Sequence, residues 1–173
     1  MDMKETALDE TSLQDNLPQG CHLRARRYGE LTTDELYDLL RTRSQVFVVE
    51  QDCVYQDVDG HDQTAIHLWL ERDGVKVAQC RICPAGTKLP RLSIGRVITT
   101  ERGRGYGLII MRKAIALAHR LYPSESGIFI ESQATKQAFY ERLGFRALSE
   151  PFMIEGLLHL NMWLSFDGAP VDA

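Results

Sequence analysis

The stretch from residue 94 to residue 118 constrains the fold more than any other part of the chain. It begins with β-branched and apolar residues typical of a strand, passes through Gly103, Gly105 and Gly107, and ends with apolar residues at helical spacing. A strand, a glycine loop and a helix in this order turn backbone N–H groups and a helix N-terminus toward one anion. We therefore predict a pyrophosphate site here, with a glycine-rich connection that holds no ligand as the alternative.

The spacing of these glycines excludes two common nucleotide motifs. A P-loop needs Lys and Ser or Thr after its last glycine, and neither follows Gly107. A dinucleotide fingerprint needs Gly-x-Gly-x-x-Gly, whereas the spacing here is Gly-x-Gly-x-Gly. What remains is Arg102-x-x-Gly105-x-Gly107, which resembles the acetyl-coenzyme A motif of the GNAT N-acetyltransferases.

Length and charge set broad limits on function. The chain has 173 residues, a length that suits one domain, and a net charge of −4, which argues against a nucleic-acid partner. No apolar run is long enough to span a membrane, and the acidic N-terminus does not read as a signal peptide, so we expect a cytoplasmic protein. Positive charge is concentrated near the glycine loop, which favours a phosphorylated small molecule. These basic residues are Arg96, Arg102, Arg104, Arg112 and Lys113.

No metal site is expected. Cys80-x-x-Cys83 lacks the second cysteine pair of a zinc ribbon, and alternation along a strand would place the two thiols on opposite faces. The run Asp57 to Asp62 looks like a calcium loop, but its glycine comes at the fourth position and Leu68 stands where a bidentate Glu belongs. We interpret the cysteines as buried thiols and the acidic loop from Asp52 to Asp62 as a surface that attracts a cationic amine.

The order of the predicted elements indicates an α/β fold with a mixed sheet. Residues 1–20 lack hydrophobic periodicity and are predicted to be a disordered tail, the domain is expected over 21–166, and 167–173 is predicted to be a second tail. Thr32-x-x-Glu35 is a capping box that predicts a helix start. Strands are predicted at 21–28, 65–71, 75–82, 92–99, 126–133, 145–148 and 157–166, with helices after residue 32, at about 108–121 and at 135–143.

A second segment strengthens the resemblance to GNAT acetyltransferases. Phe139-Tyr140-x-x-Leu143-Gly144-Phe145 is similar to the Tyr-x-x-x-Gly-Phe signature of the family's last helix and following strand, and it follows the glycine loop in the family's order. Arg43-x-x-Val-Phe-Val-Val-Glu-Gln and the later Tyr-x-Asp-x-Asp resemble the ElaA subgroup. The resemblance covers roughly residues 20–166. It implies a mostly antiparallel central sheet flanked by helices, and acetyl transfer from acetyl-CoA to an amine.

The resemblance also implies roles for individual residues. Tyr140 would protonate the leaving thiolate, and a phenol with a pKa of about 10 is a suitable donor for this step. Gln133 stands where many members have Asn, and its longer amide can still bond the pantetheine. The pantetheine would pair with the backbone of Val97, Ile98 and Thr99, and the pyrophosphate would be held by the amides of Arg102, Gly103, Arg104, Gly105, Tyr106 and Gly107.

The base and the acceptor are less defined by the sequence. Glu50, His67, Glu131 and His159 are candidates to deprotonate the amine, although a histidine in an apolar strand is more often a core residue. Arg43 lies on an apolar helix face, where it either reaches the helix edge or points into a site toward an anion or a carboxylate. A non-catalytic CoA-binding domain and an acyl-homoserine lactone synthase are the alternative functions, and exposed sheet edges would allow a homodimer.

Overall fold

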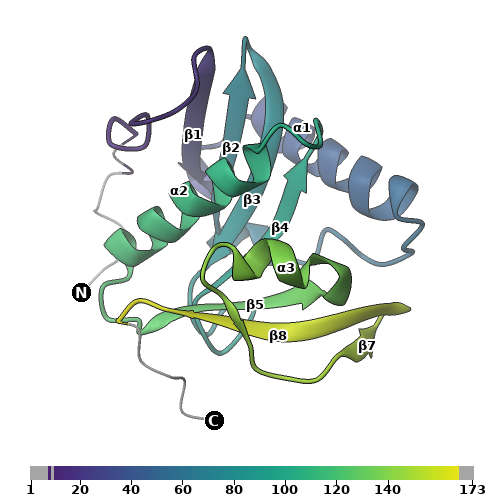
Figure 1. Cartoon of the computed structure of the whole chain (residues 1–173). Helices are drawn as coiled ribbons and strands as arrows, with labels where there is room; N and C mark the ends of the chain where they lie inside the picture. Colours follow the sequence, from purple (N-terminus) through teal and green to yellow (C-terminus); the bar gives the residue numbers. More distant parts are fainter. Residues whose placement is uncertain (1–7, 9, 168–173) are drawn as a thin grey trace.

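Among the described residues, which are residue 8 and residues 10–167, eight strands of the computed structural model form one sheet (Figure 1). The order is β1-β2-β3-β4-β5-β8-β6, and β7 pairs with β8. All neighbours run antiparallel except β4 and β5, which confirms the predicted mixed, mostly antiparallel sheet. The strands are β1 (Cys21–Arg27), β2 (Ile66–Arg72), β3 (Val75–Cys83), β4 (Ser93–Thr99), β5 (Gly127–Gln133), β6 (Arg146–Ala147), β7 (Phe152–Ile154) and β8 (Leu157–Ser165).

The helices begin and end largely where the sequence signals predict. Helix α1 (Thr33–Arg43) starts at the predicted capping box, since Thr32 Oγ1 accepts from the Glu35 N–H at 3.1 Å and the Glu35 carboxylate accepts from the Thr32 N–H at 2.9 Å. Helix α2 (Tyr106–Leu121) follows the glycine loop, and α3 (Gln137–Glu141) precedes Gly144. Short helical turns are η1 (Tyr28–Glu30), η2 (Ser44–Glu50), η3 (Asp62–Thr64) and η4 (Ala134–Lys136).

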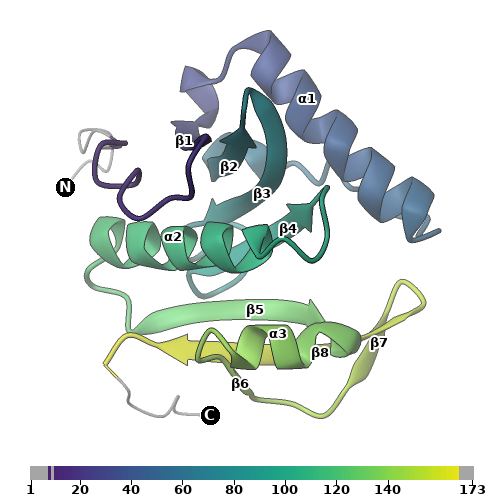
Figure 2. The same ribbon diagram turned by 45° about the horizontal axis from the view of Figure 1, so that its top comes forward.

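The main core lies between α2 and the sheet. Apolar residues at helical spacing on α2, among them Ile110, Met111 and Leu117, are fully buried against strand residues such as Leu68 and Ile82. Helix α1 covers the other face, where the Gln79 side chain of β3 donates to the Leu39 carbonyl at 3.1 Å (Figure 2). The two helices therefore lie on opposite faces of β3, and α2 also packs against β4.

The segment before β1 differs from the predicted disordered tail where the structure describes it. Leu13 is buried in the core, and the Gln14 side chain bonds both backbone groups of Leu23, at 3.1 Å to its N–H and 2.7 Å to its carbonyl. The Glu10 carboxylate accepts from the Ala25 N–H at 2.9 Å. Because β1 is the edge strand of the sheet, this segment covers unpaired backbone groups that would otherwise be exposed. Residues 1–7, 9 and 168–173 of the predicted tails lie outside the described residues.

Candidate active site

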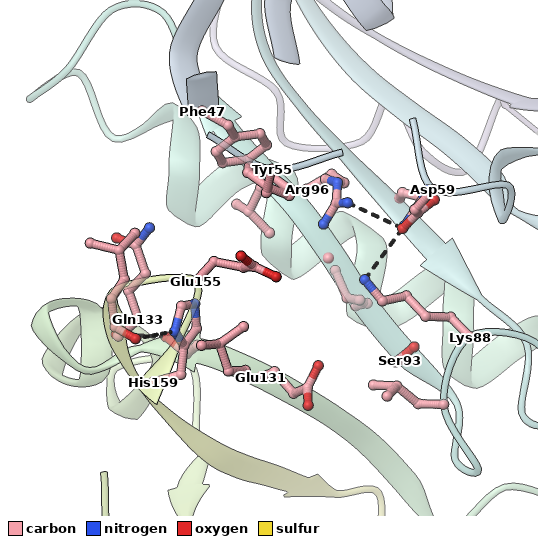
Figure 3. Close-up of a pocket in the computed structure, with 18 of the residues that line it drawn as sticks. Phe47, Tyr55, Asp59, Lys88, Ser93, Arg96, Glu131, Gln133, Glu155 and His159 are labelled. Atoms are coloured by element: carbon pink, nitrogen blue, oxygen red, sulfur yellow. Dashed lines mark hydrogen bonds and ion pairs between the residues drawn. The ribbon is translucent and has the colours of Figure 1, made fainter. Parts of the chain in front are cut away.

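The candidate site lies where β4 and β5 separate. The two parallel strands are paired only at Ser93 and Phe129, where the Phe129 N–H donates to the Leu92 carbonyl at 2.9 Å. Beyond that pair the strands diverge, and a cavity of about 480 Å³ lies between them and the elements that follow (Figure 3). A cavity where parallel strands part is the expected position for a ligand in an open α/β sheet.

A bulge in β4 shapes one wall of this cavity. The register with β3 changes between the pairs Gln79–Ile98 and Arg81–Gly95, so one extra residue is inserted in β4. Arg96 lies in this bulge with a φ of 55°, a left-handed conformation that costs a non-glycine residue about 1–2 kcal/mol. Its guanidinium group lies along the cavity, 5.4 Å from the centre of the Tyr55 ring. The bulge therefore directs a charged side chain into the site.

A π-helical turn supplies the upper wall in Figure 3. Segment η2 continues α1, and the Gln51 N–H closes it by donating to the Val46 carbonyl at 3.1 Å. Such wide turns are rare and occur often at functional sites. This turn places Phe47 and Gln51 on the cavity, and the Gln133 side chain of β5 donates to Gln51 Oε1 at 2.8 Å. Gln51 belongs to the segment that resembles the ElaA subgroup, but its spacing alone does not distinguish it from a surface glutamine, so it was not predicted as a site residue.

The acidic loop is held by buried arginines, which corrects two predictions. Arg43 is buried, with its Nε 2.7 Å from Asp57 Oδ2 and its Nη1 2.7 Å from Asp62 Oδ1. Arg43 therefore points toward carboxylates, as one of its two alternatives stated, but it does not line the cavity and is not a substrate-binding residue. Its guanidinium group is satisfied within the protein, which fits the rule that buried charges are paired.

Three carboxylates of the same loop, Asp57, Asp59 and Asp62, are bound by basic side chains and do not present free negative charge to an amine. Asp59 accepts two bonds from Arg81, both at 2.8 Å, and lies 3.1 Å from Arg96 Nη2 and 3.4 Å from Lys88 Nζ. Arg81 also reaches Asp62 Oδ1 at 2.9 Å. Burial opposes ionisation of Asp59, but the hydrogen bonds and charges of its basic neighbours outweigh burial and hold its pKa well below the usual range. The prediction that this loop attracts a cationic amine is therefore wrong for Asp57, Asp59 and Asp62, while Asp52 is exposed away from the cavity lining.

Tyr140 lies on the cavity at the end of α3, as expected for a proton donor. Its ring contacts Phe139 and Phe145 edge to face, with ring centres 5.0 and 5.8 Å apart. Gly144, with a φ of 94°, turns the chain after α3 so that Phe145 packs on this ring. Burial raises the pKa of Tyr140 far above its ordinary value, so the phenol keeps its proton at neutral pH.

Of the four base candidates, two lie on the cavity and two do not. Glu131 of β5 and His159 of β8 line it from the side opposite Arg96 (Figure 3). The His159 Nδ1 is 2.9 Å from the Leu157 carbonyl, and because a carbonyl only accepts, Nδ1 carries the hydrogen. In its neutral form His159 therefore has an unprotonated Nε2.

The predicted role of the other two candidates, Glu50 and His67, is wrong. Glu50 is exposed and binds Arg102 of the glycine loop at 2.8 Å. His67 is buried with its Nε2 3.0 Å from the Asp62 carbonyl, and burial lowers its pKa, so it is a neutral core histidine. Neither residue lines the cavity.

The glycine loop lies beyond the end of β4. Gly103 and Gly105 have φ values of 78° and 81°, and no atom lies within 4 Å of a Cβ built on either, so the loop leaves open space where a ligand could lie. Within the described residues no hydrogen-bond acceptor is found for the N–H groups of Gly105, Tyr106 and Gly107. Tyr106 itself is buried and accepts from Arg72 at 2.7 Å, so only its backbone is available. These observations fit a loop whose N–H groups can bind an anion, and we call residues 102–107 the cradle.

The three predicted cofactor residues of β4, Val97, Ile98 and Thr99, have different surroundings. Val97 lines the cavity, the Ile98 side chain is buried, and the Thr99 methyl group would be 3.4 Å from a Cβ on Gly107. The β4 edge after Ser93 that faces β5 has no partner strand among the described residues. The predicted position of Arg96 near the glycine loop is wrong, because Arg96 binds Asp57 and Asp59 at the cavity.

The two cysteines of the Cys-x-x-Cys pair lie on opposite faces of the sheet. Cys80 belongs to the core under α2, whereas Cys83 lines the cavity. In the described part of the chain, no group of three or more His, Cys, Asp or Glu side chains is arranged to hold a metal ion. None of the helices in the same residues is long and apolar enough to cross a membrane.

Comparison with known proteins gives the family. The acetyltransferase (GNAT) domain matches residues 30–166 of the chain. The chain belongs to the GNAT acetyltransferase family. GNAT members transfer acyl groups from acyl-CoA, which makes this chain an acyltransferase by family, and the open cradle and unpaired β4 edge are the features that suit such a donor.

Relatives of known structure narrow the position within the family. ElaA of Escherichia coli K12 is 36% identical over 139 residues, which cover 78% of this chain and 90% of ElaA. The crystal structure of E. coli ElaA superposes with a TM-score of 0.76 over 83% of this chain and 98% of that one. An acyl-CoA N-acyltransferase from Pseudomonas aeruginosa gives the same TM-score and coverage at 36% identity. The predicted ElaA-like subgroup is therefore confirmed, while the acyl-homoserine lactone synthase LasI, at 15% identity and a TM-score of 0.67, shares the fold alone.

Proposed function

We propose that this protein is an N-acetyltransferase that moves an acetyl group from acetyl-CoA to an amine by direct attack. The observation that carries the proposal is the continuous arrangement of three parts along β4. An open glycine loop lies at its end, an unpaired strand edge runs along it, and a cavity with a protonated tyrosine and a histidine lies beside it. A chain that only binds the coenzyme would need the first two parts and not the third.

Each part would hold a different portion of acetyl-CoA. The N–H groups of residues 102–107 would bind the pyrophosphate, with Arg102 and Arg104 adding positive charge from exposed positions. The backbone of Val97, Ile98 and Thr99 would pair with the pantetheine amides as a further strand would. Gln133, held by Gln51, would bond the pantetheine from the β5 side. Coenzyme binding would then leave the acetyl thioester beside Tyr140.

The cavity residues could carry out both proton transfers of acyl transfer, one from the amine and one to the thiolate. The amine nitrogen attacks the thioester carbonyl, and backbone N–H groups near Val97 and Ile98 stabilise the negative charge on the carbonyl oxygen. His159 Nε2 accepts a proton from the amine, because its Nδ1 already donates to Leu157. As the carbon–sulfur bond breaks, Tyr140 gives its proton to the thiolate, and the products are an N-acetyl amine and free coenzyme A.

The Tyr140→Phe variant tests this assignment. The hydroxyl group is lost while the ring contacts with Phe139 and Phe145 remain, so the fold should be kept. General acid catalysis contributes about 10²–10⁴-fold, and we expect kcat for thiol release to fall by that factor while the Kd for acetyl-CoA changes less than about twofold. Tyr122→Phe, at a buried tyrosine outside the cavity, is the matched control. An unchanged kcat in Tyr140→Phe would contradict the role.

A further inference from the structure

The two sides of the cavity carry opposite charge. Figure 3 shows Arg96 and Lys88 with Asp59 on one side, and Glu131, Glu155 and His159 on the other. All six residues line the same cavity. The acyl donor does not use this charge difference, because the β4 backbone would hold it and Tyr140 would protonate its thiolate. The difference therefore points to the acceptor.

The side of the cavity that carries Lys88 and Arg96 has one uncompensated positive charge. Its cations and carboxylates form a single connected cluster, in which every carboxylate touches at least two cations. Four cations meet three carboxylates there, so one positive charge has no counterpart in the cluster. The cations are Arg43, Arg81, Arg96 and Lys88, and the carboxylates are Asp57, Asp59 and Asp62.

Three cations of the cluster, Arg81, Lys88 and Arg96, line the cavity. Arg81 makes three hydrogen bonds to carboxylates, whereas Lys88 and Arg96 make fewer. Lys88 is the most weakly held, since its Nζ has one partner, Asp59 Oδ2, at 3.4 Å. Arg96 uses Nε and Nη2 on Asp57 and Asp59, and no bond from its Nη1 is found within the described residues. Burial lowers the pKa of Lys88, and the positive charge of Arg96 lowers it further. An anion bound between the two side chains would stabilise the charged form of Lys88 and so oppose both causes of the lowered pKa.

The opposite side offers negative charge and an acceptor for protons. Glu131 and Glu155 are exposed to the cavity, and neither forms an ion pair with another described residue. His159 lies between them and Gln133 with its Nε2 unprotonated in the neutral form (Figure 3). This side suits a protonated amine that must lose protons before it attacks the thioester.

We propose that the acceptor is a small zwitterion, an amino acid whose carboxylate binds Lys88 and Arg96 and whose amine lies toward Glu131, Glu155 and His159. This inference rests on the proposed function. The single excess charge matches one carboxylate, whereas a phosphate dianion would leave negative charge unpaired in a half-buried site. A polyamine would place a cation against the positive side, where like charges repel. Acetylation converts the amine to an amide and releases coenzyme A, and the carboxylate is unchanged.

Matched acceptor pairs test the proposal. The wild-type protein with acetyl-CoA is given each of the proteinogenic amino acids and, separately, its C-terminal amide, which keeps the amine and removes the carboxylate charge. Thiol release is followed in both series. For the best acceptor we expect kcat/KM at least tenfold higher for the acid than for its amide. Lys88→Gln should reduce this preference about tenfold, mainly through KM of the acid.

A second lysine controls for the loss of one positive charge. Lys136 also lines the cavity, from the β5 side, so Lys136→Gln should leave the acid-to-amide ratio within about twofold of wild type. Equal turnover of acids and amides, a preference for amides, or an unchanged ratio in Lys88→Gln would each overturn the acceptor assignment. Turnover of neither series while acetyl-CoA still binds would overturn it too. Failure of acetyl-CoA to bind would instead refute the proposed function.

Discussion

The ion cluster beside the cavity makes a stability prediction that follows from its geometry. Asp59→Asn keeps the side-chain shape and removes the charge that receives two bonds from Arg81 at 2.8 Å. The exposed fraction of the Arg81 side chain is 2%, so its charge cannot turn to water. Breaking a buried ion pair by removing one partner costs about 3–5 kcal/mol.

We expect the lower end of that range for Asp59→Asn. Arg81 keeps its bond to Asp62 at 2.9 Å, and the Asp59 side chain is 18% exposed, so water can partly replace the lost charge. A loss of about 3 kcal/mol in the free energy of unfolding corresponds to a fall of about 6–12 °C in Tm for a chain of this length. Asp73→Asn is the control, because Asp73 is an exposed partner of Arg72 at 3.6 Å, and it should change stability by less than about 0.5 kcal/mol.

The assay is denaturant unfolding of both variants and the wild type at several pH values. The pKa of Asp59 is lowered in the folded state, so its stabilising effect is present above its unfolded pKa of about 3.9 and is lost as the pH falls below that value. The difference between wild type and Asp59→Asn should therefore be complete at pH 7 and shrink below about pH 4. A difference under about 1 kcal/mol at pH 7, or one that grows on acidification, would refute this reasoning.

Two further predictions concern residues that the sequence selected or missed. His67→Gln should lower the free energy of unfolding, measured in urea, by about 1–3 kcal/mol and leave kcat within about twofold. The reason is that His67 is a core residue bonded to the Asp62 carbonyl and not a base. A large fall in kcat with unchanged stability would contradict this. Gln51→Ala removes the acceptor of the Gln133 amide and should raise KM for acetyl-CoA about threefold to tenfold in steady-state assays, whereas Gln137→Ala, on the exposed side of α3, should not.

The fold could be predicted from the sequence where one local rule decided each element. Period-two alternation located β1, the Asp-Gly turn joined β2 to β3, and the capping box at Thr32 fixed the start of α1. Each of these signals acts between neighbours in the chain and does not depend on tertiary contacts. Strand β7 escaped prediction because its three residues form only against β8.

The N-terminal segment shows why a polar sequence is a weak sign of disorder. Residues 10–20 have no hydrophobic periodicity, yet Gln14 and Glu10 bond the backbone of β1, and one buried leucine fixes the segment to the core. Side chain to backbone bonds of this kind need no repeating pattern. Such bonds can be predicted only once the position of the edge strand β1 in the sheet is known.

The sequence indicated the glycine loop and the tyrosine of the candidate site, but not how its charged side chains pair. The glycine spacing indicated the loop, because it reflects short local geometry, and the resemblance of the Tyr-x-x-x-Gly-Phe segment to the family signature indicated Tyr140. The charges depend on pairing across the fold, and the sequence could not show that Arg43 and Arg81 neutralise the acidic loop. Nor could it show that Lys88, which lies in the loop between β3 and β4, lines the cavity.

Calorimetric titration with acetyl-CoA tests the central claim most directly. Gly105→Asp would place a side chain and a negative charge in the proposed cradle at a φ of 81°, and Gly86→Asp, at a φ of 76° and equally open, carries the same backbone strain in the loop before β4. We predict micromolar binding by the wild type and by Gly86→Asp, and no measurable binding by Gly105→Asp. Absence of binding by the wild type, or equal binding by both variants, would contradict the proposed use of acetyl-CoA in this loop.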